Sequence, residues 1–109
     1  MEADYCIAEV FSALGDPTRL ALVRKLGGGR ALSATALSSG ANVTRQAIVK
    51  HLQVLEGAGW VIHEREGREV LYSLEITSLA RVQAFLGEIS TEWDMAIERL
   101  RILVEASSY

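Results

Sequence analysis

Apolar residues near the start of the chain recur at intervals of three or four, which predicts two short helices. In the first helix the apolar positions are Ile7, Val10, Phe11 and Leu14. After Gly15, the pair Asp16 and Pro17 is typical of a new helix start. The carboxylate of Asp16 can accept hydrogen bonds from free backbone N–H groups, and Pro17 has no N–H to leave unpaired in the first turn. The buried side of the second helix is expected to be Leu20, Val23 and Leu26, and three glycines then end it at residues 27–29.

A second pair of helices is predicted between residues 33 and 56. Ser33 can cap a short helix that ends near residue 39, and Thr44 can cap a longer one that ends at Gly57. The four residues 40–43 between them include a glycine and an asparagine and predict a tight turn. Two helices joined in this way form a helix-turn-helix motif. The preceding residues 30–32 can form a brief strand.

Residues 61–74 have the alternating pattern of a β-hairpin. Two strands, 61–65 and 69–74, flank a turn in which Gly67 supplies the required flexibility. A hairpin that directly follows a helix-turn-helix motif is called a wing. The sequence therefore predicts a mainly α fold with a small β-hairpin wing, of class α+β, in which residues 1–109 form a single domain.

The last third of the chain has the most regular apolar pattern. Its apolar residues follow one another at alternating steps of three and four, as in a coiled-coil seam: Leu79, Val82, Leu86, Ile89, Trp93, Ala96, Leu100 and Leu103. Such a narrow stripe packs against another helix, and the short first helix is too small to cover all of it. The pattern therefore predicts a second subunit.

Charge and cysteine content narrow the class of protein. The net charge is −3, yet residues 16–50 carry six arginines and lysines against Asp16 alone, so a basic surface can form within an acidic chain. With Cys6 as the single cysteine, no internal disulfide forms, which favours a cytoplasmic location. No apolar stretch is long enough to span a membrane, and none is expected to bind one. A structural role for Cys6 and a redox role both stay open.

Three segments of this chain resemble the ArsR/SmtB family of winged-helix repressors. They are residues 11–19 (FSALGDPTR), 50–61 (KHLQVLEGAGWV) and 65–74 (REGREVLYSL). The resemblance implies a winged helix-turn-helix fold with dimerisation helices at residues 1–14 and 76–105, and repression that a signal relieves. The residues expected at the dimer interface are Ile7, Phe11, Leu79, Val82, Leu86, Ile89, Trp93 and Leu100.

The chain departs from the metal-sensing members of that family. Those members carry a cysteine pair on the first helix of the motif or an Asp/His/Glu set on the last helix. Residues 33–38 here contain no cysteine, and the last helix contains no histidine. Because thiolate and imidazole are the usual ligands of such metals, the chain resembles the subgroup without metal sites, and no cofactor is expected.

The helix at residues 44–56 is expected to read double-stranded DNA. Ile48, Leu52 and Leu55 share its buried side, and the opposite side presents Gln46, Val49, Lys50 and Gln53. Gln46 can bond adenine, Arg45 or Lys50 can contact guanine, and Val49 can touch a thymine methyl group. Thr44 and the free amides beside it can meet a phosphate. Arg65 and Arg68 flank the wing tip and can bind the backbone or the minor groove, although Glu64, Glu66 and Glu69 surround them and can neutralise them.

Other functions have less support in the sequence. An acidic wing and a negative total charge also fit a winged-helix protein-interaction module that does not bind DNA. No constellation typical of an enzyme site is present: His51 is expected to pack or to lie beside a phosphate, and His63 has no cysteine or second histidine nearby. The release signal stays open between a small molecule, a thiol change and a protein effector.

Overall fold

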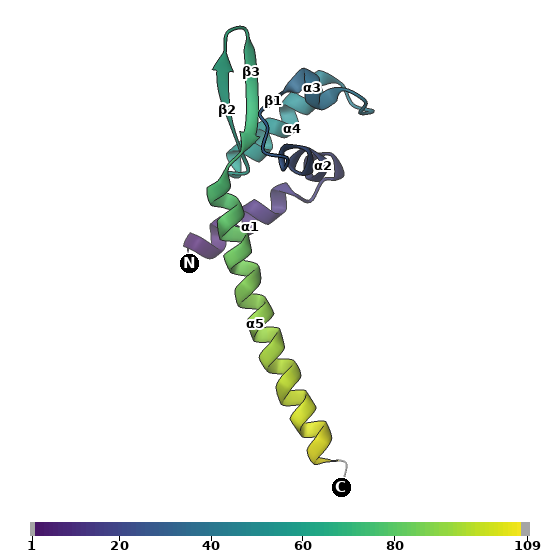
Figure 1. Ribbon diagram of the computed structural model, residues 1–109, viewed down its shortest axis with the longest axis vertical. Coiled ribbons are helices and arrows are strands. Elements are labelled where there is room, and N and C mark those ends of the chain that lie inside the picture. The colour runs from purple at the N-terminus through teal and green to yellow at the C-terminus, as the bar shows by residue number, and fades with distance from the viewer. Residues whose placement is uncertain (1, 108–109) are drawn as a thin grey trace. The chain divides into compact units, whose positions relative to one another are not determined.

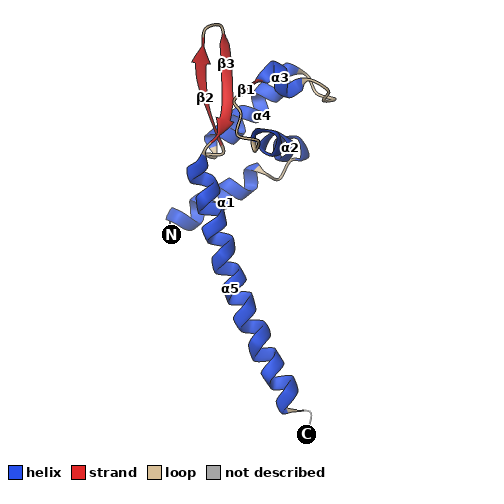
Figure 2. Ribbon diagram, viewed as in Figure 1, coloured by secondary structure: helices blue, strands red, loops and turns tan. Residues whose placement is uncertain are grey.

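The computed structural model describes residues 2–107, with side chains from Ile7 onward. The chain divides into two compact units, residues 1–79 and residues 80–109. The described residues form eight helices and strands, and their arrangement can be followed in Figures 1 and 2. In chain order they are α1 (Glu2–Ala13), α2 (Pro17–Leu26), β1 (Leu32–Ser33), α3 (Ala34–Ser38), α4 (Arg45–Gly57), β2 (Val61–Glu66), β3 (Glu69–Leu74) and α5 (Ile76–Ala106).

The predicted hairpin is present and is part of a three-stranded antiparallel sheet with the order β1-β3-β2. Val61 pairs with Leu74 at the base of the hairpin, and Glu66 pairs with Glu69 at its tip. Gly67 turns the chain with φ 63°, a left-handed conformation that glycine adopts without strain. The brief strand expected at residues 30–32 lies instead at Leu32–Ser33, where it pairs with β3.

Side-chain caps begin the helices where the sequence predicts them. The hydroxyl of Ser33 accepts a bond from the backbone N–H of Ala36 at 3.1 Å, and that of Thr44 accepts one from Ala47 at 3.1 Å. Asp16 accepts bonds from the N–H groups of Thr18 and Arg19 at 2.9 and 3.2 Å. Each cap satisfies donors that the first turn of a helix leaves unpaired.

The core lies where the helices of the first unit meet the base of the wing. Its most completely buried side chains are Leu26, Leu37, Ile48, Leu52, Leu55, Val10 and Val61. One prediction is wrong: Leu20 is 45% exposed, whereas Leu22 is 2% exposed. The reason is the rotation of α2, because Leu22 and Leu26 stand one turn apart on its inner side. Leu20 shares the outer side with the exposed Arg24.

The C-terminal end of α1 is held by two side chains from elsewhere in the first unit. The N–H of Leu14 bonds the carbonyl of Phe11 as α1 ends. The indole N–H of Trp60 donates to the carbonyl of Val10 at 2.6 Å, and Nε of Arg19 donates to the carbonyl of Ala13 at 2.6 Å. Terminal carbonyls of a helix otherwise lack partners, so these two bonds fix α1 against the start of the wing and the start of α2.

The second unit is helical up to Ala106 and carries most of the predicted apolar stripe. Exposure is 49% for Leu86, 65% for Trp93 and 62% for Leu100. Arg101 pairs with Glu98 and Glu105, each at 2.5 Å, along one side of the same helix. The stripe on α5 is therefore uncovered in the single chain. The core and redox roles considered for Cys6 concern a side chain that lies outside the described ones.

We expect Trp60→Phe to lower the free energy of unfolding by about 1–3 kcal/mol, because the buried carbonyl of Val10 then has no donor. Urea unfolding at one fixed protein concentration measures the loss. Met95→Leu is the control, since this 57% exposed side chain lies outside the apolar stripe of α5 and makes no hydrogen bond among the described residues. Equal losses in the two variants would contradict the assigned role of the Trp60 bond.

The Asp16 cap predicts a dependence of stability on pH. The pKa of Asp16 lies below its ordinary value of 3.8, chiefly because the N–H of Arg19 bonds its carboxylate, with further contributions from the N–H of Thr18 and the charges of His51 and Arg19. Since the folded pKa is depressed, this stabilisation is present above pH 3.8 and is lost as the pH falls through the folded pKa.

Asp16→Asn keeps a capping oxygen but removes the charge. We expect it to destabilise the protein at pH 7, and we expect the difference from the unsubstituted protein to shrink below pH 3.8. Ser33→Ala removes a cap that does not titrate, so its cost of about 0.5–2 kcal/mol should not vary with pH. Urea unfolding from pH 7 to pH 3 tests both, and a constant difference for Asp16→Asn would refute the assignment.

Candidate nucleic-acid interface

Helix α4 separates its buried and exposed residues cleanly. Ile48, Leu52 and Leu55 are at most 1% exposed, so one side of the helix is sealed into the core. The opposite side carries the exposed Gln46, Lys50 and Gln53, with the half-buried Val49 between them. The structure thus brings these four predicted site residues onto one accessible side. Thr44 lies just before them and uses its hydroxyl for the cap, with φ −74° and ψ 160°.

Arg45 lies at the flank of α4 and is held there by α3. Its Nε donates to the hydroxyl of Thr35 at 3.2 Å. The bond connects the two helices of the helix-turn-helix motif, whose inner side is closed by the buried Ala34 and Leu37. Sequence reasoning did not single out Thr35, and a threonine ten positions before Arg45 gives no local signal of this contact.

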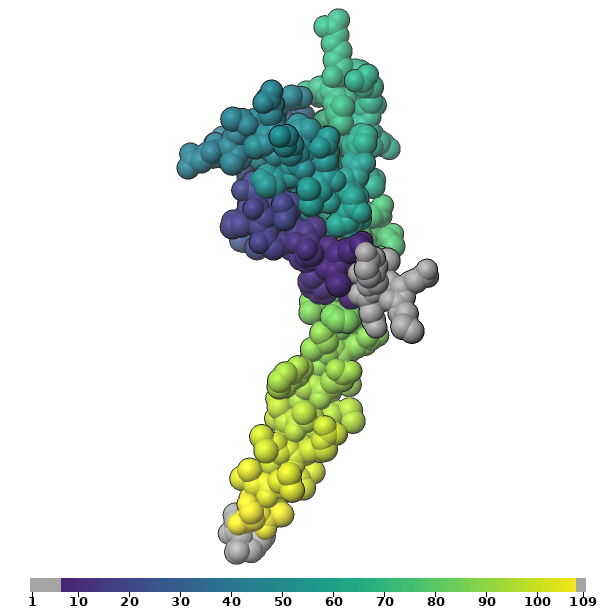
Figure 3. Space-filling view, turned by 180° about the vertical axis from the view of Figure 1, so that it is seen from behind, coloured from purple at the N-terminus to yellow at the C-terminus, as the bar shows by residue number. Residues whose placement is uncertain are grey.

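The wing places its two arginines beside α4. Arg65 and Arg68 line the same hollow as Arg45, which has a volume of about 450 Å³. Its other lining residues are Ser33, Ala34, Thr35, Val49, Glu69, Val70 and Tyr72. Figure 3 shows the tip of the hairpin projecting beyond the helices of its unit. The three arginines named separately by the sequence are therefore brought together by the fold.

The strand register explains how the acidic residues of the wing are distributed. Arg65 pairs with Val70, and His63 pairs with Tyr72, so these four side chains share one face of the hairpin. Glu64 and Glu66 alternate onto the other face. Only Glu69 among the wing's acidic residues lines the hollow. Within the described residues neither Arg65 nor Arg68 forms an ion pair.

Two histidines connect α4 to neighbouring elements. His51 is half-buried, with Nδ1 3.5 Å from a terminal nitrogen of Arg19 and 3.9 Å from the carboxylate of Asp16. It thereby connects the middle of α4 to the start of α2. His63 lies with Nδ1 2.6 Å from the carboxylate of Glu56, and its ring centre is 5.8 Å from that of Tyr72. This second contact connects the end of α4 to the base of the wing.

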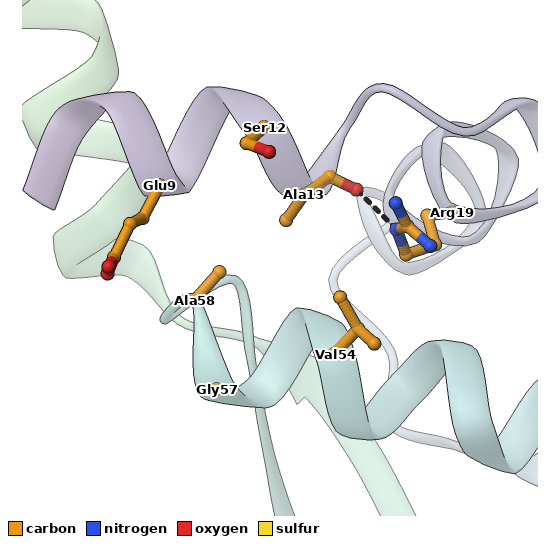
Figure 4. A pocket seen from close by; sticks show the side chains of 7 residues that line it. All are labelled: Glu9, Ser12, Ala13, Arg19, Val54, Gly57 and Ala58. Atoms are coloured by element: carbon orange, nitrogen blue, oxygen red, sulfur yellow. Dashed lines mark hydrogen bonds between the residues drawn. The ribbon is translucent and has the colours of Figure 1, made fainter.

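A smaller hollow of about 350 Å³ lies between α1 and the end of α4 (Figure 4). The view shows Val54 and Ala58 from the α4 side and Ala13 from α1, with the Arg19 bond to the Ala13 carbonyl at its edge. Glu9 and Ser12 complete the α1 side. None of the predicted DNA-reading residues lines this hollow, so the two sides of α4 are chemically distinct.

Two features are absent from the described residues. No group of three or more histidine, cysteine, aspartate or glutamate side chains there has an arrangement that could hold a metal ion. No helix in residues 2–107 combines the length and the apolar character needed to cross a membrane.

Comparison with known proteins places this arrangement in a family. Residues 14–64 match the family model of a helix-turn-helix domain. The transcriptional repressor SdpR of Bacillus subtilis is 34% identical over 70 residues, which cover 64% of this chain and 77% of SdpR. The HTH-type transcriptional regulator NmtR of Mycobacterium tuberculosis is 33% identical over 76 residues, or 70% of this chain. The match spans 62% of NmtR, so less than two thirds of that protein.

Solved structures that are similar to this chain are also described as regulators or DNA-binding domains. An ArsR-like transcriptional regulator from Rhodococcus sp. RHA1 is 33% identical, covers 94% of this chain and 96% of its own, and superposes with a TM-score of 0.80. The homodimeric winged helix-turn-helix DNA-binding domain Mb0332 from Mycobacterium bovis is 24% identical, covers 80% of each chain and has a TM-score of 0.64. The second likeness concerns the fold alone. The chain belongs to the ArsR/SmtB family of winged helix-turn-helix transcriptional regulators.

Proposed function

We propose that this chain is a homodimeric repressor that binds an imperfect palindrome in double-stranded DNA through α4. The observation that carries the proposal is the clean division of α4 into a sealed side and an accessible polar side. A helix with a sealed rear surface enters a major groove as a rigid body, and its N-terminal residues meet the base edges. Such a protein is a regulator rather than an enzyme, and it acts in the cytoplasm, where bacterial DNA lies.

The exposed residues of α4 have distinct proposed roles. Gln46 bonds adenine through its amide, Lys50 contacts guanine acceptors, and Val49 touches a thymine methyl group. Gln53 lies further along the same side and reaches bases or sugar-phosphate. Thr44 caps the helix, and the free backbone N–H groups next to it meet a phosphate. Base contacts set the preferred sequence, whereas phosphate contacts set the position of the helix.

Dimerisation is proposed to occur through α5. The side chains of its stripe residues Leu86, Trp93 and Leu100 are 49–65% exposed in the single chain, and such an apolar surface is unfavourable in water. Ile7, by contrast, is already buried in the single chain, with only 8% of its surface exposed. It therefore has little surface left to contribute to the interface. A two-fold dimer places two α4 helices in successive major grooves about 34–36 Å apart. That spacing requires a palindromic site.

Repression is the proposed outcome of binding, since SdpR is named a transcriptional repressor. A dimer bound to its site prevents other proteins from binding the same stretch of DNA. A small-molecule or protein effector releases the complex in this proposal.

We expect the double variant Gln46→Ala/Lys50→Ala to bind its selected DNA at least about tenfold more weakly, because each good base contact contributes roughly 1–3 kcal/mol. Fluorescence anisotropy with a duplex selected from a randomised pool measures this at two salt concentrations. Arg24→Ala removes an exposed charge of α2 and should have little effect. Failure of the unsubstituted protein to bind any pool DNA would contradict the proposal and favour an interaction module.

The dimer is tested independently of DNA. Trp93→Glu should convert the protein to a monomer at micromolar concentration, because it buries a charge in the proposed interface. Met95→Glu introduces the same charge on the opposite side of α5, where Met95 is 57% exposed, and should leave the dimer intact. Sedimentation velocity distinguishes the two. A monomeric unsubstituted protein, or a dimer that tolerates Trp93→Glu, would exclude α5 as the interface.

A further inference from the structure

We propose that the hollow between α4 and the wing binds one phosphate group of the DNA backbone, held jointly by Arg45, Arg65 and Arg68. The inference rests on the proposed function for its ligand. It adds that the helix and the wing hold the same phosphate, rather than separate parts of the duplex. The shared phosphate then fixes how deeply α4 enters the groove.

Convergence of charge is the first support. Arg45 comes from the first turn of α4 and the other two arginines come from the wing, yet all three line one hollow of about 450 Å³. Glu69 is the only carboxylate among the lining residues, so three cations face one anion. Guanidinium groups suit a phosphate because their planar N–H groups match its oxygens in pairs. An excess of arginine around one concave surface therefore selects an anion with several oxygens.

Orientation of Arg45 is the second support. Thr35 accepts the bond from its Nε, which holds the guanidinium at the flank of α4 and leaves the two terminal nitrogens for a ligand. The flank lies toward α3 and the wing, whereas Gln46 and Lys50 occupy the side that faces bases. Arg45 is thus assigned to the backbone and not to guanine. Thr35 acts through it as a positioning residue.

The remaining walls of the hollow are apolar or carry hydroxyl groups. Ala34, Val49 and Val70 complete the wall beside the exposed arginines with apolar side chains. Ser33 uses its oxygen as the acceptor of the α3 cap, so its hydroxyl proton stays available to donate. Tyr72 adds a second hydroxyl from β3. The site therefore offers hydroxyl donors beside the three charges.

The test pairs protein variants with single neutral phosphates in the DNA. A selected duplex is prepared with one methylphosphonate at each backbone position in turn. Its affinity is measured for the unsubstituted protein and for Arg45→Ala, Arg65→Ala and Arg68→Ala. On unmodified DNA each substitution should weaken binding by roughly tenfold, as expected for loss of a charge-assisted bond. At one position per half-site, neutralising the phosphate should abolish the effect of all three substitutions.

Two controls separate this effect from a general loss of charge or fold. Arg24→Ala should lose as much affinity at each methylphosphonate position as the unsubstituted protein does, and the thermal unfolding of each exposed arginine variant should match that of the unsubstituted protein. Thr35→Val should weaken binding, Thr35→Ser should restore it, and neither should matter once Arg45→Ala is present. This non-additivity identifies Thr35 as acting through Arg45.

The possible results are distinguishable. If the protein binds its selected DNA but the three arginines respond to different phosphates or to none, the shared site is wrong and the proposed function stands. If the protein binds no DNA from the pool, the proposed function and the phosphate site both fail. A single position common to all three variants supports both.

Discussion

The complete burial of one side of α4 is the constraint on which the rest of the interface depends. Ile48, Leu52 and Leu55 leave no freedom for the helix to rotate, because any rotation would expose leucine or isoleucine to water. The helical period then decides which residues are presented outward, and these are Gln46, Lys50 and Gln53. Contacts at both ends keep this orientation. The Thr44 cap begins the helix, and the Glu56 contact to His63 connects its last turns to the wing.

Electrostatics in this chain are local. A net charge of −3 argues against nucleic-acid binding only if charge is averaged over the chain. Strand alternation places Arg65 on the face that turns toward α4 and places Glu64 and Glu66 on the other face. The fold therefore converts an acidic hairpin into one side of a basic hollow. The same principle applies to α5, where Glu98 and Glu105 are paired with Arg101 and stand apart from the apolar stripe.

Local chemistry made much of this fold predictable from the sequence. Asp16, Ser33 and Thr44 are capping residues, and each cap forms within three residues along the chain. The buried side of α4 follows from spacing alone. The buried side of α2 was less predictable, because two apolar stripes both end at Leu26. One contains Leu20 and the other contains Leu22, and only packing against other elements selects the second. The wing's pairing with β1 likewise depends on residues far apart in the sequence.

The contacts that could not be predicted from the sequence join residues far apart along the chain. Trp60 reaches Val10 across 50 positions, and the convergence of Arg45 with the wing arginines depends on the same folded arrangement. The DNA-reading roles of the exposed α4 residues and the interface role of the α5 stripe remain predictions. Both depend on a partner that is not part of this chain: a duplex in one case and a second copy in the other.

Amide chemical shifts during titration with the selected duplex would test the central claim most directly. If α4 reads DNA, the largest changes should map to residues 44–53 and to the wing tip at 65–68, and the hollow between α1 and the end of α4 should change little. Changes confined to α5 or to the α1 hollow, with none along the exposed side of α4, would contradict the account.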